Sequence, residues 1–395
     1  MLARMLLLLL LTLLMGDGGG VMGKCPAHGT HPCTCTIREG DAMDIDCESK
    51  KLTSMPDMTA FKGHPIHTLT LAQNDISELP ERFLDGLIFR SPFPRQSASI
   101  DLSGNTLSII SPDAFVGLQS PDLGLLLQSC NLHQLPSLAL SKMTNWTFLF
   151  LDDNQISSLN KNPFVGLRKL RHIELSGNPI KHINQDTFSD QKDVLKALHL
   201  NNMQLNALPV DVLQDLTRLQ TLTLDDNQIT VLPPNAFNKF RTTGHMTINL
   251  RRNHLNYIPR DTFTGATFRL KNLRLDDNDL SQLDFLRDYC AYVFSASPSV
   301  YVNDNPINCN CKLYDVIRSN KINLDGACAV PTEYYGTELG PSFLQMGSEK
   351  CEAELPQQPC ESSSANVARL LNTPCCLVYA LLSTLMFLLP SSLSA

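Results

Sequence analysis

Apolar residues between positions 58 and 303 recur in a unit of roughly 25 residues, a length typical of stacked repeats. The clearest copies read Leu-Asp-Asp-Asn and begin at Leu151, Leu224 and Leu275. Aligning the other copies on these gives one asparagine-type position per unit: Asn74, Asn105, Cys130, Asn154, Asn178, Met203, Asn227, Asn253, Asn278 and Asn305. Successive positions are 31, 25, 24, 24, 25, 24, 26, 25 and 27 residues apart. Such a period indicates units that stack side by side, because one unit alone cannot bury its apolar face.

Each unit is predicted to contain a short strand and an irregular return segment. The residues three and five positions before the asparagine are apolar, as Leu149 and Leu151 are, and this period of two gives a strand one buried face. A large apolar residue stands ten positions after most of the asparagines: Phe115, Leu140, Phe164, Phe188, Leu213, Phe237 and Phe263. The pattern LxxLxLxxNxL is typical of an α/β leucine-rich-repeat solenoid, a horseshoe with a concave parallel β-sheet and an irregular convex side.

Some positions depart from the pattern. Cys130 is small and can replace an asparagine as a weak donor, whereas Met203 has no amide, so we expect a loosened turn or a bound water there. The long first step contains a proline-bearing insertion at 90–97, and the last step contains an irregular segment at 287–298. We expect both segments to be loops that leave the solenoid.

Cysteines cluster at the two ends of the repeat. Of the 13 in the chain, four precede it and four follow it: Cys25, Cys33, Cys35 and Cys47, then Cys309, Cys311, Cys328 and Cys351. In a secreted chain such clusters indicate disulfides, and a zinc site is the less favoured alternative. The run C-x7-C-x-C-x11-C followed by LTSMP, and the later NPINCNC, resemble the caps of extracellular leucine-rich-repeat proteins. The resemblance implies caps at 24–57 and 304–352, with the pairs Cys25–Cys35, Cys33–Cys47, Cys309–Cys328 and Cys311–Cys351.

Both chain ends have the composition of processing signals. Residues 1–23 combine Arg4, a short apolar run and several glycines, which predicts a secretory signal peptide rather than a signal anchor. A linker at 353–374 contains Ser362, Ser363 and Ser364 and precedes an apolar tail at 375–395. This order predicts a GPI-anchor signal with attachment at Ser363 and removal of the tail. A transmembrane helix is the alternative, but the apolar run would span only about 22 Å of a core of about 30 Å. After removal of the tail, which contains Cys375 and Cys376, Cys290 and Cys360 remain as candidates for a further disulfide.

A ligand site is predicted on the concave face, toward which the residues four and six positions before each asparagine point. Leu126, Phe148 and Phe150 form an apolar cluster on adjacent units in an otherwise polar column. Exposed aromatic clusters tend to anchor partners, although such residues can also simply shield a sheet. The predicted ligand-binding residues are Leu126, Phe148, Phe150, Glu174, His172, His199, Arg251 and Arg274.

Other motifs carry weaker signals. Aspartate pairs at 152–153, 225–226 and 276–277 could offer calcium its oxygen ligands, but a solvated polar rim is the favoured interpretation. The sequon Asn145-Trp146-Thr147 predicts N-glycosylation at Asn145, with Trp146 partly buried.

Charge and missing motifs exclude several function classes. The formal net charge of -7 argues against nucleic acid as a partner. The sequence contains no P-loop, GxSxG, HExxH or dinucleotide-binding fingerprint, so we expect no enzyme, no cofactor and no metal. The layout resembles that of Nogo-receptor-like and variable-lymphocyte-receptor-like proteins, which implies a GPI-anchored recognition, adhesion or receptor module on the extracellular face of the plasma membrane. Its expected ligand is an extracellular protein or glycan. Two alternatives are a secreted non-catalytic subunit or carrier that escorts an enzyme or hormone, and an innate-immune pattern receptor.

Overall fold

The computed structural model describes residues 26, 31–242, 244–286, 294–319 and 322–354. These residues divide into two compact units, one containing the chain up to 229 together with 239–253, the other containing 230–238 and the chain from 254 onward. The predicted signal peptide, the GPI region with Ser363, the apolar tail, and Cys25, Cys290 and Cys360 lie outside the described residues.

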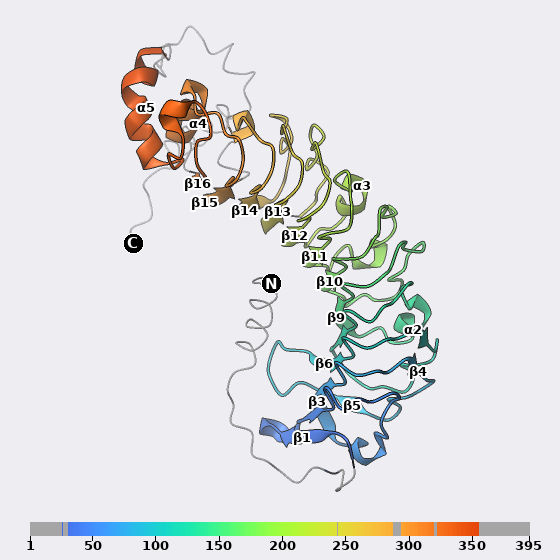
Figure 1. Ribbon diagram of the computed structural model, residues 1–395. Coiled ribbons are helices and arrows are strands. Elements are labelled where there is room, and N and C mark those ends of the chain that lie inside the picture. The colour runs from blue at the N-terminus through green and yellow to red at the C-terminus, as the bar shows by residue number, and fades with distance from the viewer. Residues whose placement is uncertain (1–25, 27–30, 243, 287–293, 320–321, 355–395) are drawn as a thin grey trace, which may run out of the picture. The chain divides into compact units, whose positions relative to one another are not determined.

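The first unit is built on a sheet whose strands follow one another along the chain (Figure 1). Its strands are β1 (Thr34–Ile37), β2 (Met43–Asp46), β3 (Pro65–Thr70), β5 (Ile88–Phe89), β6 (Ala98–Asp101), β8 (Leu123–Leu126), β9 (Trp146–Phe150), β10 (His172–Glu174), β11 (Ala197–His199), β12 (Thr221–Thr223) and β13 (His245–Asn249). β1 pairs antiparallel with β2, and all later pairs in this unit are parallel.

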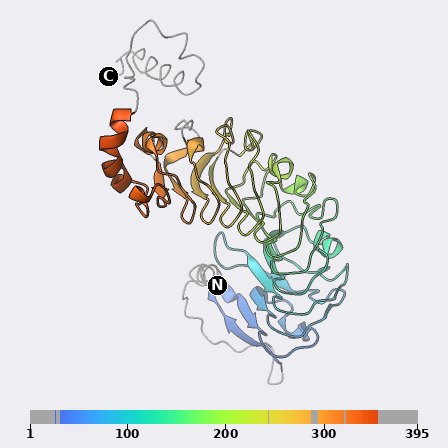
Figure 2. The ribbon, with the colours of Figure 1, turned by 45° about the horizontal axis from the view of Figure 1, so that its top comes forward.

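Short elements make up the return segments of the first unit. They are η1 (Glu39–Asp41), η2 (Thr59–Phe61), the small parallel sheet of β4 (Glu78–Leu79) and β7 (Ile109–Ile110), α2 (Ser137–Ser141), η3 (Ser189–Gln191) and α3 (Val210–Leu213). Figure 2 shows the main strands side by side, with the loops and short helices of the return segments on the other side of the repeat. Among the residues that the structure describes, no regular element therefore covers the face of the main sheet that points away from the return segments.

The second unit continues the same pattern and ends in helices. It contains β14 (Arg269–Arg274), η4 (Asp284–Leu286), β15 (Phe294–Tyr301), α4 (Cys311–Ser319), β16 (Asn323–Asp325), η5 (Thr332–Tyr334) and α5 (Pro341–Glu354). The strands β14, β15 and β16 pair in parallel. None of the described helices is long and apolar enough to cross a bilayer.

The core lies between the sheet and the return segments, as the periodicity predicts. The inward strand residues Leu125, Leu149 and Ile173 stand in register on adjacent strands and are fully buried. The second predicted apolar column is buried as well, with Phe164 stacked on Phe188 at 5.6 Å between ring centroids. These observations confirm the predicted leucine-rich-repeat solenoid with a parallel sheet.

The ladder asparagines join each repeat to the one before it. The Asn154 amide donates to the carbonyls of Leu127 and Leu151 at 2.8 Å each, and its oxygen accepts from the backbone N–H groups of Cys130 and Leu132 at 3.0 and 2.9 Å. The side chain thereby satisfies backbone groups at the strand exit that would otherwise be buried without partners. Asn74 and Asn227 make equivalent bonds.

The two irregular ladder positions are handled differently. The Cys130 thiol donates to the Leu102 carbonyl at 3.1 Å, in the manner of an asparagine amide. Met203 is fully buried, and in the repeat before it the Ile180 N–H donates to the Asn178 carbonyl at 2.8 Å. The Ile180 N–H thus bonds within its own repeat, whereas the Ile156 N–H donates to the Asn178 side chain of the next repeat.

The described cap disulfides join Cys33 to Cys47, Cys309 to Cys328 and Cys311 to Cys351. These are three of the four pairs that the resemblance to extracellular caps implies. Cys35 is disulfide-bonded as well. Each disulfide restricts the unfolded ensemble and so stabilises a repeat end that cannot stack further.

Two expectations about the strands and the core need correction. Residues 294–298 do not leave the solenoid as a loop, because they belong to β15, and a register shift between Leu270 and Asn272 accommodates the extra length. Trp146 is fully buried rather than partly buried, since its ring meets Phe115 edge-on and its N–H donates to the Leu140 carbonyl at 3.1 Å.

Candidate ligand-binding surface

The uncovered face of the first unit carries a row of side chains formed by one residue from each of five strands. Strand register places Asp101 beside Leu126, Leu126 beside Phe150, Phe150 beside Glu174, and Glu174 beside His199. We call these five residues the central row. Adjacent strands lie about 4.8 Å apart, so neighbouring members of the row are within reach of one another. An apolar centre, Leu126 and Phe150, is therefore flanked by two carboxylates.

Phe148 enlarges this apolar centre. Its ring lies 5.3 Å from that of Phe150 between centroids, at a tilt of 34°. Strand register pairs Phe148 with Gly124 on one side and His172 on the other. Both aromatic rings are half-buried rather than fully exposed. The predicted cluster is thus brought together, but it presents less open ring surface than the sequence suggested, because Gly124 lets Phe148 settle onto the sheet.

The two carboxylates of the central row are partly withdrawn from water. Asp101 accepts a hydrogen bond from the Ser103 N–H, and Glu174 accepts one from the Ser176 N–H, each at 2.9 Å. Burial raises the pKa of both carboxyl groups, and the serine bonds only partly oppose this effect. Within the described residues, neither carboxylate forms an ion pair with a lysine or an arginine.

The histidines beside Glu174 do not neutralise it. His199 Nδ1 lies 3.0 Å from the Thr223 hydroxyl and 4.0 Å from Glu174 Oε2. Burial lowers the pKa of His199 to about 4, so this imidazole is uncharged at neutral pH. The pKa of His172 is also lowered, by desolvation and then by the nearby His199, Lys196 and Arg171. The predicted residues Glu174, His172 and His199 therefore form an adjoining polar group with little positive charge.

The insertion at 90–97 stands at one border of this surface. It is a loop, as expected, and it projects from the strand side between β5 and β6 (cyan in Figures 1 and 2). Phe93 links the loop to the sheet, because its ring meets His67 edge-on at 5.5 Å and lies 5.9 Å from the Arg38 guanidinium. The Ser97 hydroxyl also lies 2.7 Å from the Thr147 hydroxyl, next to Phe148.

A polar network beneath Phe93 was not found from the sequence. The Asp44 carboxylate accepts hydrogen bonds from Arg38, from His67 at 3.1 Å and from Thr68 at 2.7 Å. Burial acts to raise the Asp44 pKa, but these bonds together outweigh it and hold the pKa below its ordinary value. These residues come from the cap and from β3, so only the pairing of β2 with β3 could have revealed their proximity.

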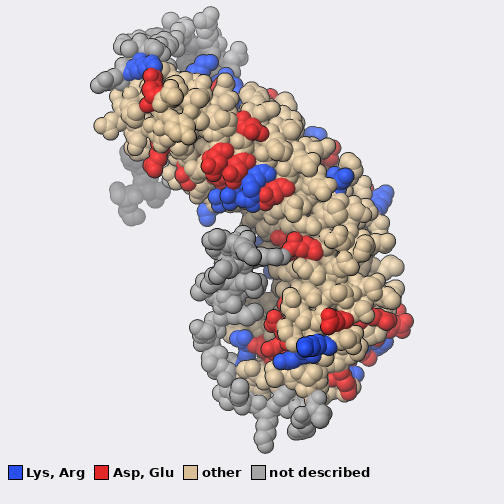
Figure 3. Space-filling view, viewed as in Figure 1, with Lys and Arg blue, Asp and Glu red and all other residues tan. Residues whose placement is uncertain are grey.

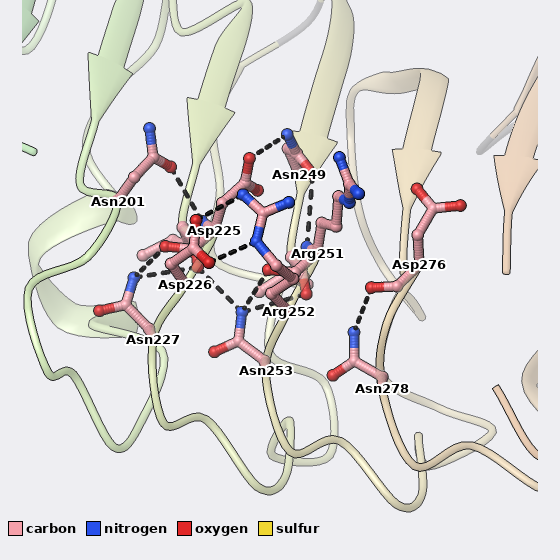
Figure 4. A network of polar contacts seen from close by, with 12 residues as sticks. Asn201, Asp225, Asp226, Asn227, Asn249, Arg251, Arg252, Asn253, Asp276 and Asn278 are labelled. Atoms are coloured by element: carbon pink, nitrogen blue, oxygen red, sulfur yellow. Dashed lines mark hydrogen bonds and ion pairs between the residues drawn. The ribbon is translucent and has the colours of Figure 1, made fainter. Parts of the chain in front are cut away.

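The strand exits carry a second polar network (Figure 4). Asn201 accepts from the Asp225 N–H at 2.8 Å, Asn249 donates to the Asp225 carboxylate at 2.6 Å, and Arg252 pairs with Asp226. The predicted ligand residue Arg251 lies at this edge, beyond the central row, and its N–H donates to the Asn249 side chain at 3.3 Å. The aspartates at 225–226 are thus engaged by amide and guanidinium donors.

Arg274 belongs to the second unit and is outside the central row. Its guanidinium donates to Asp276 at 3.0 Å and lies 4.9 Å from the Tyr301 ring. Asp276 is 3% exposed, so the expected solvated rim is wrong at this position, because the Arg274 guanidinium and the side-chain amide of Asn303, at 3.3 Å, cover its carboxylate. Within the described ranges, no group of three or more His, Cys, Asp and Glu side chains is arranged to hold a metal ion.

Surface charge elsewhere is mixed in sign. On the face shown in Figure 3, basic and acidic side chains lie next to one another over the described residues, and broad areas carry neither. At the predicted glycosylation sequon, the Asn145 amide is half-buried and donates to the Ser120 carbonyl at 2.8 Å. One of its two N–H hydrogens is engaged by this bond.

Comparisons with known proteins agree with this fold. A family model described as leucine rich repeat matches residues 124–180 and 193–242. The chain is 32% identical over 174 residues to human "Leucine-rich repeats and immunoglobulin-like domains protein 1", covering 44% of this chain and 15% of that protein. It is 26% identical over 307 residues to the "Oplophorus-luciferin 2-monooxygenase non-catalytic subunit" of Oplophorus gracilirostris, covering 75% of this chain and 80% of that protein.

A similarity to solved structures extends over most of the chain. A chain from the octameric complex of Latrophilin 3, Unc5D and FLRT2 superposes with a TM-score of 0.53 at 20% sequence identity. The match covers 78% of this chain and 95% of that one. At this identity the likeness supports the solenoid fold and says nothing about a shared ligand.

Proposed function

We propose that this leucine-rich-repeat protein is a non-enzymatic recognition module that binds an extracellular protein or glycan through the central row and Phe148. The observation that carries the proposal is the half-buried pair of Phe148 and Phe150, which lies on a sheet face that no regular element of the described residues covers. Aromatic side chains in such settings supply a large part of the binding energy at interfaces. The disulfides of both caps fit an oxidising, extracellular compartment.

The test replaces the central aromatic by a charge. The full chain, purified from animal cells, is screened against an array of purified extracellular proteins and glycans, and the Kd of each ligand found is measured. Phe150→Asp should weaken binding at least about tenfold, because it removes an anchor and places a carboxylate between Asp101 and Glu174. Val165→Asp introduces the same charge at an exposed apolar position of the first unit and should leave Kd unchanged. A folded Phe150→Asp variant that binds as the unmodified chain does would refute the proposal.

The same proposal places the protein on the outer face of the plasma membrane through a GPI anchor at Ser363. Its support is the order of small residues, spacer and apolar tail in the sequence. Treatment of intact expressing cells with phosphatidylinositol-specific phospholipase C should release the protein. A variant with Ser362, Ser363 and Ser364 replaced by bulky residues should no longer be displayed. Retention after the enzyme treatment, together with normal display of the variant, would contradict the anchor.

A second function has a specific observation in its favour. The similarity to the non-catalytic subunit from Oplophorus covers most of both chains, so a role as a secreted partner of an enzyme is the alternative proposal. In that case the protein accumulates in the medium and co-purifies there with a catalytic chain. Release only after phospholipase treatment, without an enzyme bound, would favour the receptor proposal instead.

A further inference from the structure

The central row combines an apolar middle with an acid at each end. Leu126 and Phe150 occupy the middle, Asp101 lies on the next strand to one side, and Glu174 lies on the next strand to the other. The two carboxylates are three strand spacings apart, which corresponds to about 14 Å. The free surface is therefore a short apolar platform bounded by negative charges.

These charges lack a cationic partner within the described part of the chain. Glu174 accepts a hydrogen bond from the Ser176 N–H and lies 4.0 Å from the uncharged His199, and Asp101 accepts a hydrogen bond from the Ser103 N–H. Burial already raises the pKa of both carboxyl groups, and covering them with an apolar ligand would increase that cost further. A ligand that covers this row is favoured only if it brings positive charge to both ends.

We propose that the partner is an extracellular protein that places two basic side chains on Asp101 and Glu174 and one apolar side chain between them on Leu126 and Phe150. This inference rests on the proposed function and specifies the chemistry of its ligand. Charge complementarity selects the partner, because lysine or arginine pairs with the partly desolvated carboxylates more strongly than with exposed ones.

An extended peptide segment has the dimensions that this row needs. Side chains at positions i, i+2 and i+4 of a strand project to the same side, and four residues of extended chain span about 13 Å. A segment of the form basic-x-apolar-x-basic, lying across β6 to β10, would place its two cations over Asp101 and Glu174. The half-buried Phe148 would then flank the apolar side chain.

The test uses a phage-displayed library of random nine-residue peptides, selected on the full chain. We expect enriched sequences to carry two basic residues four positions apart with an apolar residue midway. Synthetic peptides of that sequence should bind the Asp101→Asn/Glu174→Gln variant about tenfold more weakly, since two charge-assisted contacts are lost. The Asp186→Asn/Asp211→Asn variant, which removes two exposed acids of the first unit, should bind them unchanged.

A charge reversal strengthens the test. Glu174→Lys should reject the selected peptide, and replacement of one of the peptide's two basic residues by glutamate should restore binding to that variant only. Enriched peptides without basic residues, or equal binding to the Asp101→Asn/Glu174→Gln variant, would overturn the inference. If Phe150→Asp abolishes binding of an array ligand while the neutralised variant retains it, the proposed function stands and the cationic ligand is wrong. If neither change affects binding, both are wrong.

Discussion

Gly124 lies directly beneath the ring of Phe148 on the neighbouring strand. A Cβ atom at position 124 would come within 1.7 Å of the Phe148 Cζ atom, closer than any real contact allows. Without a side chain at 124, the ring settles onto the backbone and is half-buried. The shape of the candidate surface therefore depends on the absence of one methyl group.

We predict that Gly124→Ala lifts the Phe148 ring away from the sheet. The clash involves the ring edge, which can move, so the free energy of unfolding should fall by only about 1 kcal/mol. Binding at the central row should change more than stability does, because Phe148 flanks Phe150. Urea unfolding and Kd for the array ligand check this prediction. Gly244→Ala is the control, since a Cβ there meets nothing within 4 Å. Equal behaviour of the two variants would show that the ring is not constrained by Gly124.

Asn154→Ala should be among the more damaging single substitutions in the first unit. It removes partners from the backbone N–H groups of Cys130 and Leu132 and from the Leu127 carbonyl, all of them buried. Unsatisfied buried groups cost about 1 to 3 kcal/mol each, and partial relaxation should bring the loss to about 3 kcal/mol. Asn160→Ala alters an exposed asparagine of the same repeat and should change the unfolding free energy by less than about 0.5 kcal/mol.

The fold could be predicted from the sequence because the residue pattern within each repeat determines which strand face is buried and where the strand ends. A leucine at 149 and another at 151 fix which face of β9 is buried, and the asparagine at 154 marks where the strand ends. The stack then follows, since no single repeat can cover its apolar face. The first residues of β15 were predicted to be a loop. They belong to the strand because a register shift in its pairing with β14 accommodates the extra residues before Ser299, and the sequence of β15 alone does not reveal that shift.

The candidate site was predicted less completely. The alternation of strand residues placed Leu126, Phe150 and Glu174 on one face correctly, because strand geometry alone decides that. It did not indicate how deeply Phe148 settles, which depends on Gly124 one repeat earlier. Nor did it associate Asp101 with the cluster, although the same spacing rule applies to it. Contacts such as Phe93 with His67 depend on the path of an insertion, for which no periodic pattern exists.

The free energy of unfolding should decrease in acid, and protonation of His199 should contribute to the decrease. Its folded-state pKa of about 4 is below the ordinary value of 6.5, so the unfolded chain binds the proton more readily. Stability is then lost as the pH falls from about 6.5 toward 4. Glu174 acts in the opposite direction, because its raised pKa favours proton uptake by the folded state.

The His199→Gln variant isolates this contribution. Between pH 7 and pH 4.5 it should lose about 2 kcal/mol less unfolding free energy than the unmodified chain does. Denaturant unfolding at the two pH values measures the difference. His133→Gln changes an exposed histidine and should match the unmodified chain. If the His199→Gln variant loses as much unfolding free energy in acid as the unmodified chain, groups other than His199 are responsible for the loss.

Cys130 should be chemically inert in the folded protein. Burial raises the pKa of its thiol to about 12, and the reactive species is the thiolate. Iodoacetamide at pH 8 should therefore leave the peptide that contains Cys130 unmodified until denaturant is added, as mass spectrometry of proteolytic fragments would show. Labelling of Cys130 at the same rate in folded and denatured protein would contradict its burial.

Met203 stands where most repeats have an asparagine, and this difference affects how neighbouring repeats are coupled. In the preceding repeat, the Ile180 N–H bonds within its own turn, to Asn178, as the Ile307 N–H does to Asn305 in the last repeat of the ladder. Ile156, by contrast, donates across to the next asparagine. We call this bond from a backbone N–H to the asparagine side chain of the next repeat the clamp. Met203 has no amide to accept it, so the clamp is missing there, as it is at the end of the ladder. In a linear array held together by contacts between neighbours, a missing clamp lowers the coupling at that junction. We therefore expect partial unfolding that begins at either end of the first unit to stop more readily between the repeats of Asn178 and Met203 than at a junction where an asparagine oxygen accepts from the preceding repeat.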